Sequence, residues 1–302
     1  MEISLLRAMP PDALLARLPE FLVTNIRDPA VAASTRDRVA RCLTDWPPSA
    51  GPAILAYLNT LGEAPQLYHA EPHCRQVSRV WSLDVLPDPV LEGVAHLRAA
   101  LEAGPTVVLC NHLSYVDTTA ADHVLAAHGH ADLADRLATV AGPKVYADLL
   151  RRFAAAGLNT LPAPQSTRLE HTAHLGPREL ARLARASVEA GNEALQAGFA
   201  LQLYPEGSRT RTGHLGPFLR GVHRYLATPG LRIVPAAIAG TQHVFPVDAT
   251  HIVPGPVRLA FGPPLDVASL GGPKDALAAV HGAVASLLPP ALKPAPDTPP
   301  IR

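Results

Sequence analysis

Residues 106–117 read TVVLCNHLSYVD, an apolar, β-branched run that becomes polar at Asn111 and His112. The apolar part predicts a buried strand over 106–110, and the residues from Ser114 to about Ala127 predict a helix. In α/β sheets, ligands bind beyond the carboxyl ends of the strands, which is where Asn111 and His112 fall. This stretch therefore predicts an α/β fold and the place of a functional site within it.

The chain on both sides of this stretch alternates between apolar runs and helical periods. A helix is expected from Asp88-Pro89, an N-cap followed by proline at the first helical position, to Gly104. Further strands are expected over 137–141, 158–161, 199–204, 233–239 and 257–261, and further helices over 143–156, 177–196, 218–226 and 277–288. The alternation predicts an α/β domain over residues 88–288, with a mixed, mostly parallel sheet flanked by helices.

Two further regions flank this domain. Residues 1–87 predict a smaller N-terminal helical lobe, in which Leu14, Leu18 and Leu22 line one face. We interpret that face as core packed over the sheet rather than as a membrane anchor. Residues 289–302 contain six prolines and predict a disordered tail.

The composition excludes several classes of protein. The 26 basic residues balance 26 acidic ones, which argues against nucleic-acid binding. The three cysteines have no C-x-x-C spacing, so neither a disulfide framework nor a zinc site is expected, and no metal is predicted. No apolar run approaches the roughly 18–20 residues that span a bilayer. The composition predicts a cytoplasmic protein that is at most peripheral to a membrane.

His112 and Asp117 form the first candidate site. On one helix they would point about 140° apart, so they can face each other only if His112 lies in the turn before the helix. Ser114 to Asp117 fits a capping box that supplies this turn, with Ser114 as the N-cap. The imidazole would then be a candidate base whose tautomer Asp117 sets. The alternative is a capping acid beside a structural histidine.

Residues 203–211, LYPEGSRTR, form the second candidate site. Proline ends the preceding strand, and Gly207 lets backbone amides approach a ligand closely. Arg209 and Arg211 lie two apart, so an extended chain places both guanidinium groups on one side, where they suit a phosphate. Glu206 is expected to accept from a substrate hydroxyl or to hold one arginine. The alternative is a solvated turn with surface ion pairs.

Together the two sites resemble a known family. His112 through Asp117 resembles the H-x4-D motif of the glycerol-3-phosphate and 1-acylglycerol-3-phosphate acyltransferases (PlsC-like), and residues 205–209 resemble their P-E-G-[TS]-R motif. Residues 234–236 are similar to the family's Val-Pro strand. The layout is closest to the soluble plastid-type glycerol-3-phosphate acyltransferases, which combine a helical lobe with an α/β domain. Those enzymes carry adjacent basic residues where this chain has Ala-Pro-Gln-Ser at 163–166.

The resemblance implies transfer of an acyl group to a glycerol-phosphate hydroxyl in phospholipid biosynthesis. Acyl-CoA or acyl carrier protein would be the co-substrate, with no cofactor, and glycerol 3-phosphate or lysophosphatidic acid the acceptor. His112 and Asp117 would be catalytic, and the substrate-binding residues would be Glu206, Gly207, Ser208, Arg209, Arg211 and Pro235. Two alternatives stay open: a non-phosphorylated hydroxyl or amino-lipid acceptor, and a catalytically idle module that binds acyl carrier protein or a membrane.

Overall fold

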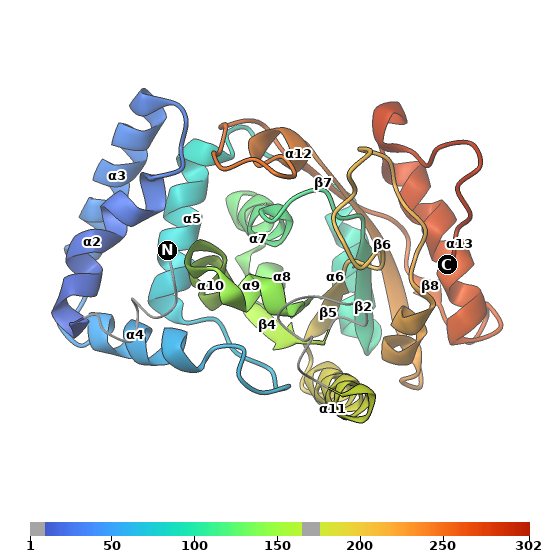
Figure 1. Cartoon of the computed structure of the whole chain (residues 1–302). Coiled ribbons are helices and arrows are strands. Elements are labelled where there is room, and N and C mark those ends of the chain that lie inside the picture. The colour runs from blue at the N-terminus through green and yellow to red at the C-terminus, as the bar shows by residue number, and fades with distance from the viewer. Residues whose placement is uncertain (1–9, 165–175) are drawn as a thin grey trace.

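A mixed sheet forms the centre of the protein. The computed structural model describes residues 10–164 and 176–302 (Figure 1), and within them eight strands form one sheet in the order β1-β7-β6-β2-β5-β3-β4, with β8 paired to β6. The strands are β1 (Val90–Glu92), β2 (Thr106–Cys110), β3 (Leu137–Ala141), β4 (Asn159–Pro162), β5 (Ala200–Leu203), β6 (Arg232–Ala239), β7 (Arg258–Phe261) and β8 (Leu265–Asp266).

The pairing confirms a mostly parallel sheet. Central β2 is parallel to both of its neighbours, β5 and β6, and is buried along its whole length. Such two-sided burial explains its continuous run of apolar residues. Strand β6 pairs antiparallel with β7 and with β8. Because β2 and β5 run in the same direction, their carboxyl ends meet at one edge of the sheet.

Helices cover both faces of the sheet. One face carries α6 (Val94–Ala103), α7 (Asp117–Ala127) and α10 (Leu149–Ala156), and the other carries α11 (Pro177–Gln196), α13 (Pro273–Leu287) and the 3₁₀ helix η1 (Arg220–Leu226). Shorter helices are α8 (Ala131–Ala134), α9 (Pro143–Ala147), α12 (Thr241–Val244) and the 3₁₀ helix η2 (Pro290–Leu292). None of the helices in the described parts of the chain is long and apolar enough to cross a bilayer.

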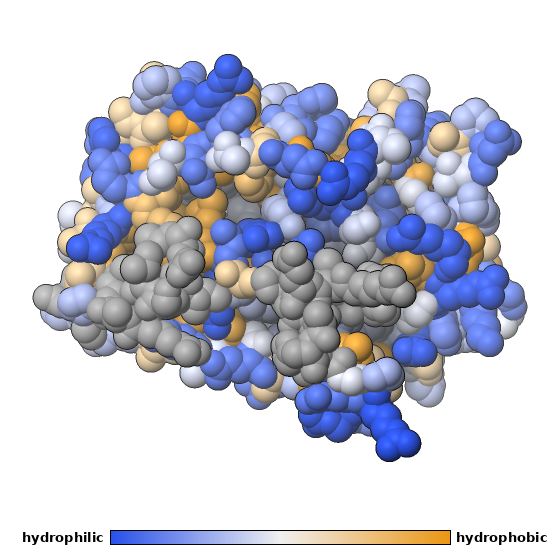
Figure 2. Space-filling view, in the orientation of Figure 1, coloured by the Kyte–Doolittle hydropathy of each residue, from blue (hydrophilic) through white to orange (hydrophobic). Residues whose placement is uncertain are grey.

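The N-terminal region is helical, as predicted. It consists of α2 (Pro11–Val23), α3 (Pro29–Leu43), α4 (Ala50–Thr60) and α5 (Pro72–Val85), at the left of Figure 1. Leu14, Leu18 and Leu22 are buried, and the indole of Trp81 donates to the Leu22 carbonyl over 3.0 Å. Their stripe is therefore core. Some hydrophobic residues also reach the lobe surface, at the left of Figure 2.

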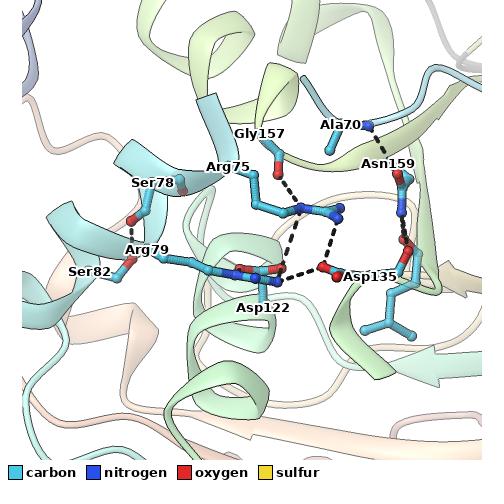
Figure 3. Close-up of polar contacts among 10 residues, drawn as sticks. Ala70, Arg75, Ser78, Arg79, Ser82, Asp122, Asp135, Gly157 and Asn159 are labelled. Atoms are coloured by element: carbon cyan, nitrogen blue, oxygen red, sulfur yellow. Dashed lines mark hydrogen bonds and ion pairs between the residues drawn. The ribbon is translucent and has the colours of Figure 1, made fainter. Parts of the chain in front are cut away.

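A cluster of charged side chains joins the N-terminal lobe to α7 (Figure 3). Arg79 of α5 donates to both carboxylate oxygens of Asp122 on α7, over 2.8 and 2.9 Å, and to Asp135 over 2.8 Å. Arg75 donates to Asp135 over 2.8 Å and to the Gly157 carbonyl over 3.1 Å. Loss of one partner would leave a charge at this junction without compensation. The cluster thus holds α7, whose first residue is Asp117, against the lobe.

The structure corrects the helix expected to start at Asp88-Pro89. Val90–Glu92 is instead the edge strand β1, which pairs with β7, and the helix begins only at Val94. Asp88 has a φ of 49°, and Gly93 has a φ of 65° with no room for a side chain beside the Phe261 carbonyl. This left-handed glycine makes the turn between strand and helix. The capping pattern at Asp88-Pro89 therefore does not start a helix, because the residues after it pair with β7, which lies far along the chain.

The proline-rich tail is ordered, contrary to the expectation for 289–302. The Pro300 carbonyl accepts from Phe218 N, and Arg302 N donates back to the Phe218 carbonyl, both over 2.9 Å. Leu292 is buried. Proline lacks an N–H but keeps its carbonyl, so a segment with many prolines can still pair with a neighbouring strand through its acceptors. The tail therefore packs along the loop that follows the P-E-G-S-R motif.

Candidate active site

His112 lies at the point where β2 leaves the sheet. Its neighbour Asn111 continues the strand pairing with its side chain: Nδ2 donates to the Ile238 carbonyl over 3.0 Å, and Oδ1 accepts from Ile238 N over 2.8 Å. The Asn111 amide thus replaces a backbone peptide at the end of the ladder. This frees the chain to turn outward with His112 at a fixed position.

Asp117 faces His112 across the turn. Its Oδ2 lies 2.7 Å from His112 Nδ1 and also accepts from the backbone N–H groups of Leu113 (2.7 Å) and Ser114 (3.0 Å). The helix α7 begins later than expected, at Asp117, so Ser114 is not its N-cap. Contacts of the expected capping box are nevertheless present, because Asp117 reaches back to Ser114 N and the Ser114 hydroxyl oxygen accepts from Val116 N over 3.4 Å, while its hydrogen is donated to the Phe245 carbonyl over 2.7 Å. Asp117 itself organises the turn by binding the N–H groups that precede it.

This geometry determines the tautomer of His112. An ionised carboxylate only accepts hydrogen bonds, so Nδ1 carries the proton and Nε2 presents a lone pair. The His112 side chain is 19% exposed, whereas Asp117 is 1% exposed. Among the described residues, no hydrogen bond is made to Nε2. The arrangement can accept a proton from a bound hydroxyl at Nε2.

Glu206 joins the second motif to the first. One oxygen accepts from His112 N and the other from Gly216 N, both over 2.8 Å, and Thr210 N donates to the His112 carbonyl over 2.9 Å. Glu206 is 4% exposed. The structure therefore corrects the two roles expected for it, since its carboxylate binds backbone instead of an arginine or an open substrate position. Gly207, with a φ of 72°, has no room for a side chain against Leu219.

Burial raises the pKa of Glu206 from 4.5 to about 7, against the backbone donors at Gly216 and His112, which lower it. Because the folded carboxyl holds its proton to higher pH than the unfolded one, the stabilisation is present below pH 4.5 and is lost as pH rises through about 7. We expect ionisation of Glu206 to lower the free energy of unfolding by about 3 kcal/mol as the pH rises from 4.5 to above 7. Urea unfolding from pH 4.5 to 8 measures it.

Glu206→Gln should flatten this dependence, whereas Glu102→Gln, at an exposed position on α6, should leave it unchanged. Equal pH slopes for the wild type and Glu206→Gln would contradict the assignment of the raised pKa to Glu206.

Tyr115, inside the first motif, brings together two arginines. The guanidinium carbon of Arg209 lies 3.6 Å from the centre of the Tyr115 ring, and that of Arg151 on α10 lies 4.4 Å from it. Arg211 instead forms an exposed ion pair with Asp248 at 2.9 Å. The structure therefore gives Arg209 and Arg211 different partners, contrary to the expected pair. Phosphate binding by Arg211 requires this pair to open, which costs little at the surface.

The remaining predicted site residues with a described position are Ser208 and Pro235. Ser208 is exposed, and Pro235 is buried in β6 beside Leu109 of β2. No described contact joins Pro235 to His112. Of residues 163–166, which stand where the plastid-type enzymes carry adjacent basic residues, 165 and 166 lie outside the described residues. Within the described ranges, no three His, Cys, Asp or Glu side chains gather as a metal site would require.

Comparison with known proteins shows that the segment with both motifs matches a known family. Residues 91–239 match the model of the family described as "Acyltransferase". They contain β2, the His112–Asp117 turn, the P-E-G-S-R loop and all of β6. This segment belongs to the acyltransferase family. The acyltransferase resemblance that the two motifs indicate is thereby confirmed for this segment.

The acyltransferase domain has similar relatives in plants. The chloroplastic 1-acyl-sn-glycerol-3-phosphate acyltransferases of Brassica napus and Arabidopsis thaliana are each 32% identical over 74 residues, which is 24% of this chain and 22% and 21% of theirs. The chain thus matches about a fifth of the length of these curated relatives. The 1-acyl-sn-glycerophosphate (LPA) acyltransferase PlsC of Thermotoga maritima shares the fold, with a TM-score of 0.51 and 16% identity over 90% of this chain and 92% of that one.

Several residues of the candidate site were not predicted from the sequence. Tyr115 lies inside the first motif and Tyr204 directly precedes the second. Their closeness to the motifs could have indicated a role, but the motif patterns do not specify these two positions. Arg151 gave no signal, because nothing in its helix distinguishes it from a surface cation. Only the folded chain brings it to Tyr115.

Proposed function

We propose that this protein transfers an acyl group from an acyl thioester, carried by coenzyme A or acyl carrier protein, to the free hydroxyl of a 1-acylglycerol 3-phosphate. One observation carries the proposal: His112 Nε2 presents a lone pair in the same turn whose Tyr115 ring contacts the guanidinium of Arg209. A proton acceptor and a phosphate-binding cation thus border one turn. The family of residues 91–239 and the names of the plant relatives support the choice of reaction.

The proposed reaction is a single displacement. His112 Nε2 takes the proton of the acceptor hydroxyl as its oxygen attacks the thioester carbonyl. Asp117 stabilises the imidazolium that forms, since its Oδ2 already accepts from Nδ1–H. The tetrahedral intermediate collapses with loss of the thiolate, which takes the proton from Nε2. The oxygen–acyl bond replaces the sulfur–acyl bond, and the imidazole returns to its starting form.

Arg209 is the proposed ligand of the acceptor phosphate. Among the described residues it makes no hydrogen bond or ion pair, and its guanidinium lies against Tyr115, so its donors remain available. Arg151 lies against the same ring but also pairs with Asp148 at 3.3 Å. Two cations at one ring favour an anionic acceptor over an uncharged one. The plant relatives' names favour the lysophosphatidic acid type over glycerol 3-phosphate itself.

The test is product formation. The purified chain is incubated with acyl-CoA or acyl-carrier-protein thioester and with 1-acylglycerol 3-phosphate, glycerol 3-phosphate or 1-acylglycerol, and products are identified by mass spectrometry. The proposal expects diacylated phosphate product. Turnover of 1-acylglycerol at an equal rate would support the non-phosphorylated alternative instead, and no acylated product from any acceptor would contradict an acyltransferase activity.

Arg209→Ala is expected to raise the KM for 1-acylglycerol 3-phosphate by at least about tenfold, because one charged hydrogen-bonding group contributes roughly 1.5–3 kcal/mol. The KM for the acyl donor should change little. Arg182→Ala, at an exposed position on α11, serves as the matched control. An unchanged acceptor KM in Arg209→Ala would remove the phosphate role.

A further inference from the structure

The ring of Tyr204 lies against one face of the His112 imidazole. Tyr204 follows the last residue of β5, and its ring stacks on that of His112 with centroids 4.3 Å apart and planes 21° from parallel. The hydrogen bond from His112 Nδ1 to Asp117 fixes one ring atom but leaves the ring able to tilt about it. A flat neighbour on one face removes that freedom. The face of a tyrosine also attracts a cation, which favours the imidazolium formed when Nε2 takes a proton.

The hydroxyl of Tyr204 belongs to a chain of polar side chains that crosses the sheet. Thr139 of β3 donates to Gln202 of β5 over 3.0 Å, and the Gln202 amide donates to the Tyr204 hydroxyl over 3.2 Å. The Tyr204 hydroxyl lies 2.9 Å from the Thr118 hydroxyl, to which it is left free to donate. Gln202 and Thr139 are 2% and 5% exposed. Polar groups this deep in a sheet are retained only where they are paired, so the chain serves to hold Tyr204.

The two contacts of Tyr204 reach both members of the dyad. Its ring contacts His112, which comes from the turn after β2. Its hydroxyl contacts Thr118, which is next to Asp117 in the first turn of α7. One side chain, from the residue just after β5, thus positions the imidazole relative to α7, the helix that begins with Asp117.

We propose that Tyr204 is a positioning residue that keeps the His112 imidazole aligned with Asp117 and aims Nε2 at the acceptor hydroxyl. The catalytic role of Tyr204 rests on the proposed acyl transfer, but the effect of Tyr204 on the imidazole of His112 can be measured without any substrate. Thr118, Gln202 and Thr139 act through Tyr204 and touch no reacting atom. Tyr204 therefore belongs to the catalytic geometry although it exchanges no proton with the substrate.

Two variants separate the ring from the hydroxyl. Tyr204→Leu removes the stack, and Tyr204→Phe keeps it while removing both hydroxyl contacts. Tyr225→Leu and Tyr225→Phe are matched controls, because the Tyr225 hydroxyl is also bound, by Ser187 over 2.8 Å, in η1. Circular dichroism and thermal unfolding identify the variants that remain folded. Imidazole ¹⁵N and ¹H signals are recorded without substrate, and the His112 signals are assigned by their loss in His112→Gln.

We expect a single Nδ1–H tautomer and sharp His112 signals in the wild type and Tyr204→Phe, and shifted, averaged signals in Tyr204→Leu. Because an aromatic pair contributes roughly a tenfold effect, kcat should fall about tenfold in Tyr204→Leu with acceptor KM unchanged, and Tyr204→Phe should recover most of it. The Tyr225 variants should match the wild type. A shifted imidazole in Tyr204→Leu with no turnover even in the wild type would keep the positioning role and end the proposed function.

Other outcomes overturn the positioning role. Unchanged His112 signals in folded Tyr204→Leu would do so, as would equal losses in the Tyr204 and Tyr225 variants, which would mark a general packing effect. If Tyr204→Leu does not fold, Tyr204→Met, which also removes the ring but is more flexible, takes its place. Wild-type His112 signals and kcat in folded Tyr204→Met would then reject the positioning role.

Discussion

His112→Ala is expected to lower the kcat of acyl transfer by about a thousandfold, because a positioned general base contributes roughly 10²–10⁴ in rate. The loss should appear in kcat rather than in the acceptor KM, since the proposed phosphate contact at Arg209 is untouched. The unfolding midpoint should change little, because the side chain is partly exposed and its one hydrogen-bond partner, Asp117, keeps two backbone donors. Steady-state kinetics with a thioester donor measures the effect.

The matched control for this variant is His128→Ala. His128 lies just after the last residue of the same helix, α7, and is exposed, and its ring Nδ1 lies 2.8 Å from the Val124 carbonyl of that helix. Its turnover should equal that of the wild type. A His112→Ala protein that retains full turnover would remove the proposed base and with it the single-displacement reaction.

Asp117→Asn is expected to lower kcat by a comparable factor, roughly 10²–10⁴. The asparagine oxygen can still accept from Leu113 N and Ser114 N, so the turn should stay folded. Because Oδ2 makes all three contacts, an asparagine oxygen in its place still faces His112 Nδ1 and keeps the Nδ1–H tautomer. The neutral amide cannot stabilise the imidazolium as the carboxylate does, so the base is weakened.

Asp275→Asn is the control for Asp117→Asn, because Asp275 is also an acid in the first turn of a helix but is exposed on α13. It should keep wild-type turnover. The discriminating readout is the ¹H signal of His112 Nδ1–H: it should move upfield as kcat falls, because a neutral amide oxygen accepts a weaker hydrogen bond than a carboxylate. A fall in kcat with an unchanged Nδ1–H signal would show that Asp117 acts in another way.

Local patterns predicted most of the secondary structure. Three predicted elements match their observed bounds within one residue: the strands over 137–141 and 257–261 and the long helix over 177–196. They were predictable because apolar runs and helical periodicity depend on residues that are near in sequence. The predictions failed where distant pairing decided the outcome. Val90–Glu92 became a strand through β7, and the proline-rich tail was ordered by Phe218.

The site shows the same division. His112, Asp117, Glu206 and Arg209 were identified from motif spacing, but the role expected for Glu206 was wrong, because the sequence does not show that its carboxylate is buried between two backbone N–H groups. The expected partnership of Arg209 with Arg211 also failed. An extended chain predicts which residues are near in sequence, whereas Arg151 reaches Tyr115 from a separate helix.

The sequence by itself determined where strands end in polar turns and which side chains stand there, since these depend on local polarity, proline and glycine. Tertiary structure alone decided that β5 lies beside β2, which brings Glu206 into contact with His112 across 94 residues and places Tyr204 under the imidazole. Strand order follows from how the crossover helices pack on the two faces of the sheet, and no single segment of the chain encodes that packing.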